Sequence, residues 1–170
     1  MTKKEKPVIS EEGWKICGIP DLGEFANPIP GIQDAVDHHF YLAPDGRWRL
    51  WAAIRNARIG HLIYGWKGQS LDAADWEPDG VKIRALEEYG EHRAGLDEEL
   101  VCAPFFVEHE HRWHCLYNSS CGIHLMASEN GIDFQRILNS DGHSVIYSGG
   151  RDPMVMKWDG IYLASMPFGN

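Results

Sequence analysis

Two aspartates stand at matching points of a repeated sequence pattern. Asp152 precedes an apolar run, residues 154–157, which an Asp-Gly pair joins to a second run, residues 161–165. Asp37 precedes a similar pair of runs around the Asp-Gly pair at 45–46. Asp-Gly between apolar segments is typical of a β-hairpin turn. Two carboxylates at equivalent points of a repeat suggest sugar-cleaving chemistry, which needs one protonated and one ionised carboxyl group.

The neighbours of these aspartates suggest different roles for them. Arg151 is expected to keep Asp152 ionised, because an adjacent cation favours the charged form of a carboxylate. That suits substrate orientation better than proton donation; the alternative is that Asp152 only caps a turn before Pro153. Asp37 has a competitor in Asp34, and either could be a simple turn acceptor. Asp37 is preferred because it directly precedes the predicted strand, in the same register as Asp152.

Histidines are the other candidate site residues. His38 and His39 are adjacent, so in a strand they point to opposite faces, and we expect one to bind sugar hydroxyls while the other packs. His109, His111 and His114 lie close in sequence but at a predicted hairpin tip, where solvated polar residues are expected. We therefore predict no metal site. The sequence has no phosphate-binding glycine loop and no Gly-x-Ser-x-Gly elbow, and we expect no cofactor.

The elements that position these residues are predicted to be antiparallel strands in repeated units. The predicted strands are 40–44, 48–54, 61–66 and 76–84 in the first unit, 105–108, 112–118, 123–128 and 134–138 in the second, and 154–157 and 161–165 in the third. Trp48, Trp113 and Tyr162 occupy equivalent second strands. Four antiparallel strands per roughly 50 residues is typical of a propeller blade, whereas sandwiches rarely repeat such a unit. We therefore predict an all-β fold, a β-propeller of four-stranded antiparallel blades with about two and a half blades present.

The remaining segments follow from composition. Residues 1–12 are predicted to be loose or disordered, and residues 13–170 to form one incomplete propeller domain. A short strand is predicted at 13–19, and a short helix or loop in the acidic insertion at 85–99, whose glutamates are expected to be solvated. Six tryptophans in or near the predicted strands are expected to pack between blades: Trp48, Trp51, Trp66, Trp76, Trp113 and Trp158.

Charge and hydropathy limit the partners. The 170 residues carry a formal net charge of −9, which argues against nucleic acid or an anionic membrane, because both require a basic face. A neutral, hydroxyl-rich ligand fits better. The first ten residues lack the apolar stretch of a signal peptide, and four scattered cysteines favour reduced thiols, so a cytoplasmic location is expected.

Three phrases of the sequence resemble the five-bladed propeller glycoside hydrolases of families 43, 32 and 117. They are Ala-Pro-Phe-Phe-Val at 103–107, the run from Gly122 to Phe134, and Gly-Arg-Asp-Pro-Met-Val at 150–155. The resemblance extends from about Asp37 to the end of the chain. It identifies the fold better than the substrate.

The resemblance implies three carboxylates in a central funnel. Asp37 matches the one from the first blade, which is the general base or nucleophile, and Asp152 matches the one from the third, which orients the substrate. Arg151-Asp152-Pro153 also resembles a signature of family 32. The third carboxylate is a glutamate on a later blade that acts as the general acid. No residue here matches it, so we expect a truncated form without that acid.

Two functions remain open from the sequence. The first is a truncated glycoside-hydrolase-like propeller that hydrolyses O-glycosidic bonds, whose isolated chain is expected to be inactive. The alternative is a non-catalytic module that binds carbohydrate or assembles with itself. In both, Asp37 and Asp152 should lie on the same side of the molecule, with Arg151, His38 and His39 as substrate-binding candidates. A homo-oligomer, most simply a dimer, is expected because incomplete ends leave apolar surface uncovered.

Overall fold

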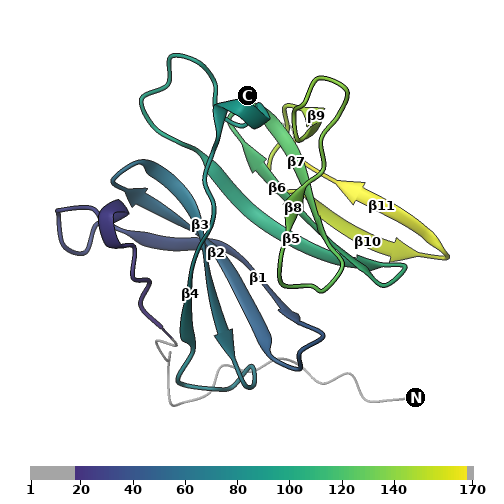
Figure 1. The fold of residues 1–170 in the computed structure, drawn as a ribbon, viewed down its shortest axis with the longest axis horizontal. Helices are drawn as coiled ribbons and strands as arrows, with labels where there is room; N and C mark the ends of the chain where they lie inside the picture. Colours follow the sequence, from purple (N-terminus) through teal and green to yellow (C-terminus); the bar gives the residue numbers. More distant parts are fainter. Residues whose placement is uncertain (1–17, 168–170) are drawn as a thin grey trace.

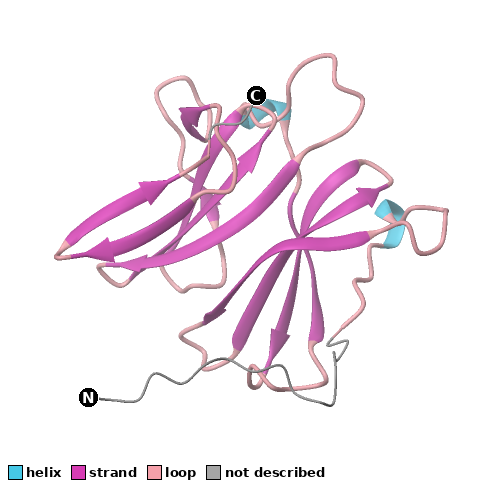
Figure 2. Cartoon of the chain, turned by 180° about the vertical axis from the view of Figure 1, so that it is seen from behind, coloured by secondary structure: helices cyan, strands magenta, loops and turns pink. Residues whose placement is uncertain are grey.

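Three antiparallel β-sheets make up residues 18–167, the part of the chain that the computed structural model describes (Figures 1 and 2). These residues contain no α-helix, and their two helical turns are the 3-10 turns η1 (Gly23–Phe25) and η2 (Glu87–Tyr89). The prediction of an all-β, antiparallel fold is therefore confirmed. Residues 1–12 and most of the predicted strand at 13–19 lie outside the described residues.

The first sheet contains four strands in sequence order, β1 (Asp34–Leu42), β2 (Trp48–Ala57), β3 (Gly60–Gly68) and β4 (Glu77–Ile83). The predicted turn at 45–46 joins β1 to β2, and Gly46 adopts the positive φ of 79° that such turns require. The central strands β2 and β3 are buried on both faces, and are accordingly rich in apolar residues on both.

The second sheet contains β5 (Val101–His109), β6 (Arg112–Ser119), β7 (Gly122–Ser128), β8 (Gln135–Arg136) and β9 (Val145–Ser148). The short strands β8 and β9 both pair with β7. Gly122 has a φ of 142°, and a Cβ on it would collide with the carbonyl of Tyr147. Only glycine therefore permits the tight passage from β6 to β7 beside β9.

The third sheet is the hairpin of β10 (Met154–Trp158) and β11 (Ile161–Ser165). In Figure 1 the first sheet is purple to teal, the second green and the hairpin yellow, and β5 contacts both β1 and β10. On one face of the hairpin, Tyr162 donates or accepts a 3.0 Å hydrogen bond with His109. The other face is apolar and exposed to solvent.

An aromatic core joins the first sheet to the second. The ring centroid of Phe106 lies 4.2 Å from Tyr41, 4.9 Å from Trp51 and 5.4 Å from Phe134. Such pairs add to the free energy of burial, so this cluster fixes β1 against β5. A second cluster, around Leu22, covers the opposite face of the first sheet.

The prediction that the strand tryptophans are core residues holds for three of them, but of these only Trp51 packs between two sheets, since Trp66 and Trp76 belong to the cluster on the opposite face of the first sheet. Trp51, Trp66 and Trp76 are each at most 4% exposed, and Trp48 and Trp113 are partly buried. The prediction is wrong for Trp158, which is 67% exposed. Trp158 lies on the outer face of the hairpin, which no described residue covers.

The insertion at 85–99 is a loop with one 3-10 turn, and it is attached by a buried ion pair. Glu91 is fully buried, contrary to the prediction of a solvated acidic stretch. Arg136 binds its carboxylate through two nitrogens, at 2.6 and 2.9 Å, and Tyr117 donates a further hydrogen bond. Removing one partner of such a pair costs about 3–5 kcal/mol, because the other charge stays buried and unpaired.

Two further features concern the whole described chain. Cys102, Cys115 and Cys121 carry free thiols, as predicted. Among the described residues, no helix has the length and apolar character needed to cross a membrane.

Buried His124 makes the stability of this fold depend on pH. Burial is the main cause that lowers the pKa of His124 from 6.5 to about 4. Above pH 6.5 the imidazole is neutral in both states; as the pH falls toward 4, the unfolded chain binds a proton that the folded chain does not. We predict a loss of roughly 3 kcal/mol of unfolding free energy over this interval.

Urea unfolding at a series of pH values would measure this loss. His124→Gln cannot bind the proton, so its unfolding free energy should vary less steeply between pH 6.5 and 4. Equal slopes for the two proteins would show that His124 does not cause the pH dependence.

Candidate functional site

Three residues with left-handed backbone conformation define the centre of the candidate site. They are Asp37 in β1, Ala103 in β5 and Asp152 just before β10, with φ values of 43°, 51° and 48°. The first two lie at interruptions of the strand register, Val36/His38 and Cys102/Phe105. This conformation costs a non-glycine residue about 1–2 kcal/mol, and such strain is concentrated at functional sites.

The prediction that Asp37 directly precedes the strand is wrong. The strand β1 begins at Asp34, and Asp37 interrupts it as a bulge. The pairing of β1 with β2 resumes at His38, opposite Ala52. The bulge turns the Asp37 side chain out of the regular alternation of faces.

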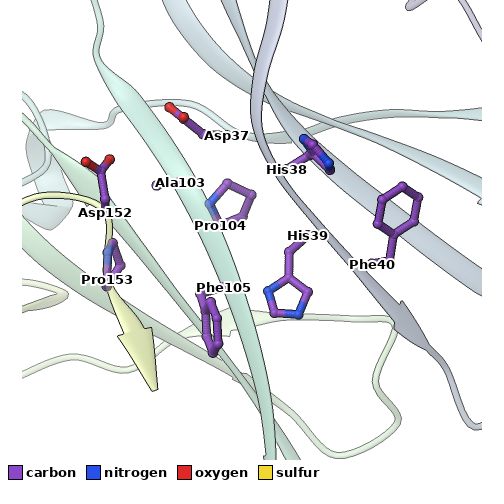
Figure 3. A pocket seen from close by; sticks show the side chains of 9 residues that line it. All are labelled: Asp37, His38, His39, Phe40, Ala103, Pro104, Phe105, Asp152 and Pro153. Atoms are coloured by element: carbon purple, nitrogen blue, oxygen red, sulfur yellow. The ribbon is translucent and has the colours of Figure 1, made fainter. Parts of the chain in front are cut away.

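The two aspartates line one open hollow of about 460 Å³, here called the carboxylate hollow. Its lining residues are Asp37, His38, His39, Phe40, Ala103, Pro104, Phe105, Asp152 and Pro153. Figure 3 shows the two carboxylates on either side of Ala103, which belongs to the intervening strand β5. The structure thus brings together both predicted catalytic candidates, and the methyl side chain of Ala103 leaves the space between them open.

Asp152 is fixed through its backbone. Its N–H donates a 3.1 Å hydrogen bond to Oδ1 of Asn118, a buried residue of β6. Nε of Arg151 lies 3.4 Å from Oδ2 of Asp152. Both side chains of this ion pair are well exposed, so the pair adds little stability and its partners remain available to a ligand.

The two histidines differ in their surroundings. Nδ1 of His39 accepts a 3.2 Å hydrogen bond from the backbone N–H of Phe106, and its ring packs edge-on against Phe105 at 4.5 Å. Burial, followed by the nearby His38, lowers the pKa of His39. His39 is therefore neutral with its proton on Nε2. The ring of His38 packs edge-on against Phe40 at 5.5 Å, and both histidines line the carboxylate hollow.

A second hollow of about 420 Å³, here called the polar hollow, shares both aspartates with the first. Its lining residues are Val36, Asp37, Arg55, His61, Leu100, Cys102, Asn118, Ser119, Ser120, Gly150, Arg151 and Asp152. The carboxylates thus stand between two spaces. Arg55, His61, Asn118 and Ser119 were missed from the sequence, because strand register brings them here and leaves no signal in the sequence.

The polar hollow contains a thiol–imidazole contact. Nδ1 of His61 lies 3.3 Å from Sγ of Cys102. Burial, assisted by Asp37 and Asp152, raises the pKa of Cys102 to about 12, so the sulfur stays protonated and is a poor nucleophile. Burial also lowers the pKa of His61. Within residues 18–167, no group of three or more His, Cys, Asp or Glu side chains is arranged to hold a metal ion.

The arrangement offers two carboxylates and several neutral hydrogen-bonding groups to a ligand. Among the described residues, neither hollow is lined by a glutamate. Glu98 of the insertion lines an adjoining hollow together with His61 and Leu100, which also line the polar hollow. The insertion therefore supplies Asp97, Glu98 and Glu99 to a hollow that adjoins the polar hollow.

Comparison with known proteins gives matches in structure only. No family model and no curated protein matches the sequence. A thermostable family-43 glycoside hydrolase matches with a TM-score of 0.55 and 14% identity, over 79% of this chain and 58% of that one. Zg3597, a family 117 glycoside hydrolase of the marine bacterium Zobellia galactanivorans, matches with a TM-score of 0.55 and 12% identity, over 86% of this chain and 51% of that one.

A third structure is CoXyl43, a GH43 β-xylosidase/α-arabinofuranosidase from a compost microbial metagenome in complex with xylotriose. It matches with a TM-score of 0.54 and 14% identity, over 86% of this chain and 46% of that one. The chain thus spans about half the length of the structures it resembles. At these identities the likeness establishes the fold alone: the described sheets are arranged like those of glycoside hydrolase propellers.

The backbone strain at Asp37, Ala103 and Asp152 leads to a stability prediction. We expect Asp37→Gly and Asp152→Gly each to raise the unfolding free energy by about 0.5–1 kcal/mol, because glycine adopts positive φ without penalty. Ala103→Gly is the matched control with no carboxylate and should behave alike. Urea denaturation measures all three.

Asp37→Val provides the opposite test. A β-branched residue tolerates positive φ poorly and should lower the unfolding free energy by more than about 1 kcal/mol. If Asp37→Gly were as destabilising as Asp37→Val, the aspartate side chain would itself stabilise the bulge, and the argument from strain would fail.

Proposed function

We propose that this chain is a portion of a glycoside-hydrolase-like β-propeller that binds carbohydrate at Asp37 and Asp152. One observation supports this most strongly. Positive-φ conformations at matching places, in the bulge of β1 and just before β10, place two carboxylates at one hollow, while the matching residue of β5, Ala103, is small. A fold kept stable by burial alone has no need of two such aspartates.

Each residue of the hollow has a chemical role in this proposal. Asp37 is the general base or nucleophile, and Asp152, beside Arg151, accepts hydrogen bonds from sugar hydroxyls. Neutral His39 uses Nδ1 to accept from Phe106, which leaves its Nε2–H to donate to a hydroxyl. Phe40 and Phe105 provide apolar ring surface at the hollow.

In this proposal the 170-residue chain binds carbohydrate but does not cleave glycosidic bonds efficiently. Glycoside hydrolysis needs a protonated carboxyl group near the leaving oxygen, and general acid catalysis contributes about 10²–10⁴-fold. The two hollows lack a third carboxyl group among the described residues. In this proposal residues 13–170 form one incomplete propeller domain, whose acid would come from outside it or from Glu98.

Calorimetric titration with a panel of oligosaccharides that includes xylotriose tests the binding. We predict that Asp37→Asn and Asp152→Asn each weaken binding about 10- to 100-fold, because each removes hydrogen bonds to a charged acceptor. Asp141→Asn, which alters an exposed carboxylate outside both hollows, should leave binding unchanged. Equal affinities for all four proteins, or no binding of any sugar, would refute the proposal.

A turnover assay on aryl glycosides separates binding from catalysis. We predict no hydrolysis above background by the purified chain, because neither hollow is lined, among the described residues, by a third carboxyl group that could donate the proton. Hydrolysis that disappears in Asp37→Asn would contradict this prediction and identify a competent acid. In that case Glu98→Gln would test one candidate from the adjoining hollow, with Glu88→Gln as a control from the same insertion.

Self-assembly is favoured by the exposed face of the hairpin. Five of its residues are between 46% and 67% exposed, namely Met154, Met156, Trp158, Ile161 and Leu163. The register places all five on the same face. Contiguous apolar surface of this kind is typical of a protein–protein interface. We propose that this face is buried in a two-fold dimer of the chain, which is the simplest assembly that would cover it.

Light scattering at micromolar concentration tests the dimer. The unchanged chain should have twice the mass of one chain, and Trp158→Ser combined with Ile161→Ser should be monomeric. Leu71→Ser, which alters an isolated exposed leucine, should remain dimeric. A monomeric and cooperatively folded unchanged chain would rule the dimer out.

A further inference from the structure

Four buried side chains form a continuous line of hydrogen bonds that ends at the polar hollow. Oγ of Ser119, a lining residue, lies 2.7 Å from Nε2 of His124. Nδ1 of His124 lies 2.9 Å from Oγ of Ser144, which lies 3.1 Å from Oε1 of Glu91. Ser119 is 6% exposed and the other three are fully buried. This line is here called the relay.

The Glu91 end of the relay can only accept hydrogen bonds. Its carboxylate accepts hydrogen bonds from Nε and Nη2 of Arg136 and from the hydroxyl of Tyr117. It also receives the backbone N–H of Leu86 at 3.0 Å. With this many donors directed at its two oxygens, Glu91 has no position for a proton of its own.

The proton of Ser144 is therefore directed away from His124. The hydroxyl has three partners besides the imidazole: Oε1 of Glu91, the carbonyl of Tyr89 at 3.3 Å and the hydroxyl of Tyr117. The first two are acceptors only, and the Tyr117 hydroxyl donates its own proton to Glu91, so the single proton of Ser144 is donated to one of these three partners. Oγ of Ser144 must then accept from His124, which places the imidazole proton on Nδ1.

The same reasoning continues to the surface of the hollow. Burial keeps His124 neutral, so with Nδ1 protonated its Nε2 is an acceptor and receives the hydroxyl proton of Ser119. Oγ of Ser119 also accepts the backbone N–H of Cys121 at 3.0 Å. Oγ of Ser119 therefore has one lone pair left to accept a hydrogen bond from a ligand, and it has no proton left to donate.

We propose that Ser119 is a specificity-determining residue of the polar hollow, where its Oγ accepts a hydrogen bond from a ligand hydroxyl. Glu91, Ser144 and His124 are positioning residues that fix this polarity. The proposal rests on the proposed carbohydrate-binding function and adds to it. The ligand group at this point is a hydroxyl donor, such as a free sugar hydroxyl, and not an ether or carbonyl oxygen.

The relay gives selectivity because it fixes the Ser119 hydroxyl as a hydrogen-bond acceptor. An isolated serine hydroxyl rotates and serves as donor or acceptor, so it accepts either type of ligand group. A serine that donates its proton to His124 presents only a lone pair to the ligand. A ligand acceptor at this point would then face another acceptor, and no hydrogen bond could form. Such a mismatch leaves desolvated polar groups unpaired, which is the strongest basis for discrimination between similar ligands.

The tautomer of His124 tests the relay without any ligand. Nitrogen-15 NMR of the folded chain at neutral pH should show a protonated Nδ1 and an unprotonated Nε2. Ser144→Ala removes the acceptor for Nδ1–H and should shift the tautomer ratio, while Ser144→Thr, which retains the hydroxyl, should restore it. A protonated Nε2 in the unchanged chain, or no difference between Ser144→Ala and the unchanged chain, would overturn the proposal.

Titration with xylotriose tests the contact with the ligand. Ser119→Ala should weaken binding about fivefold, as expected for one neutral hydrogen bond, and Ser148→Ala, an exposed serine outside the hollows, should have no effect. O-methylated xylotriose should bind the unchanged chain more weakly, and Ser119→Ala should then cause no further loss. An unchanged affinity in Ser119→Ala would overturn the proposed contact.

The two proposals fail in different ways. If the unchanged chain binds no sugar, the proposed function fails, and the His124 tautomer alone decides whether the relay has the stated polarity. If sugars bind through Asp37 and Asp152 but Ser119→Ala has no effect, the proposed function stands and the role of Ser119 is refuted.

Discussion

The left-handed backbone at Asp37, Ala103 and Asp152 is the constraint on which the candidate site depends. In a regular strand, alternate side chains point to opposite faces, and Asp37 departs from this alternation at the bulge in β1. Positive-φ conformations recur at matching places in β1, in β5 and just before β10, and in β1 and β5 they coincide with interruptions of the strand register. The energy that they cost must be supplied by contacts elsewhere in the fold.

Those contacts lie on both sides of the bulges. The aromatic cluster around Phe106 holds β1 against β5 below the hollow, and Asn118 holds the backbone of Asp152 from β6. The Glu91–Arg136 ion pair attaches the insertion to the second sheet and begins the relay to Ser119. Aromatic packing, backbone strain and a buried ion pair therefore together position the residues around the two carboxylates. A binding site built on strands in this manner is more precisely positioned than one built on loops.

Much of the fold, but less of the site, was predictable from the sequence. Asp-Gly pairs between apolar runs predicted the hairpins, because this turn chemistry is local. The bulge at Asp37 has no such local signal, so the strand was predicted to start too late. The burial of Glu91 depends on Arg136, 45 positions later, and His61 reaches the polar hollow only through the pairing of β3. Contacts set by register and by distant partners leave no pattern within a short window of sequence.

The central claim is that Asp37 and Asp152 belong to one carbohydrate-binding hollow. Amide chemical-shift mapping of the nitrogen-15-labelled chain during titration with a bound oligosaccharide tests it most directly. The account predicts the largest shifts at residues 37–40, 103–105 and 151–153, three segments that are distant in sequence and meet only at the carboxylate hollow. Shifts confined to one of these segments, or centred on Leu50, Trp66 and Trp76, which line a further hollow together with His38 and Phe40, would contradict it.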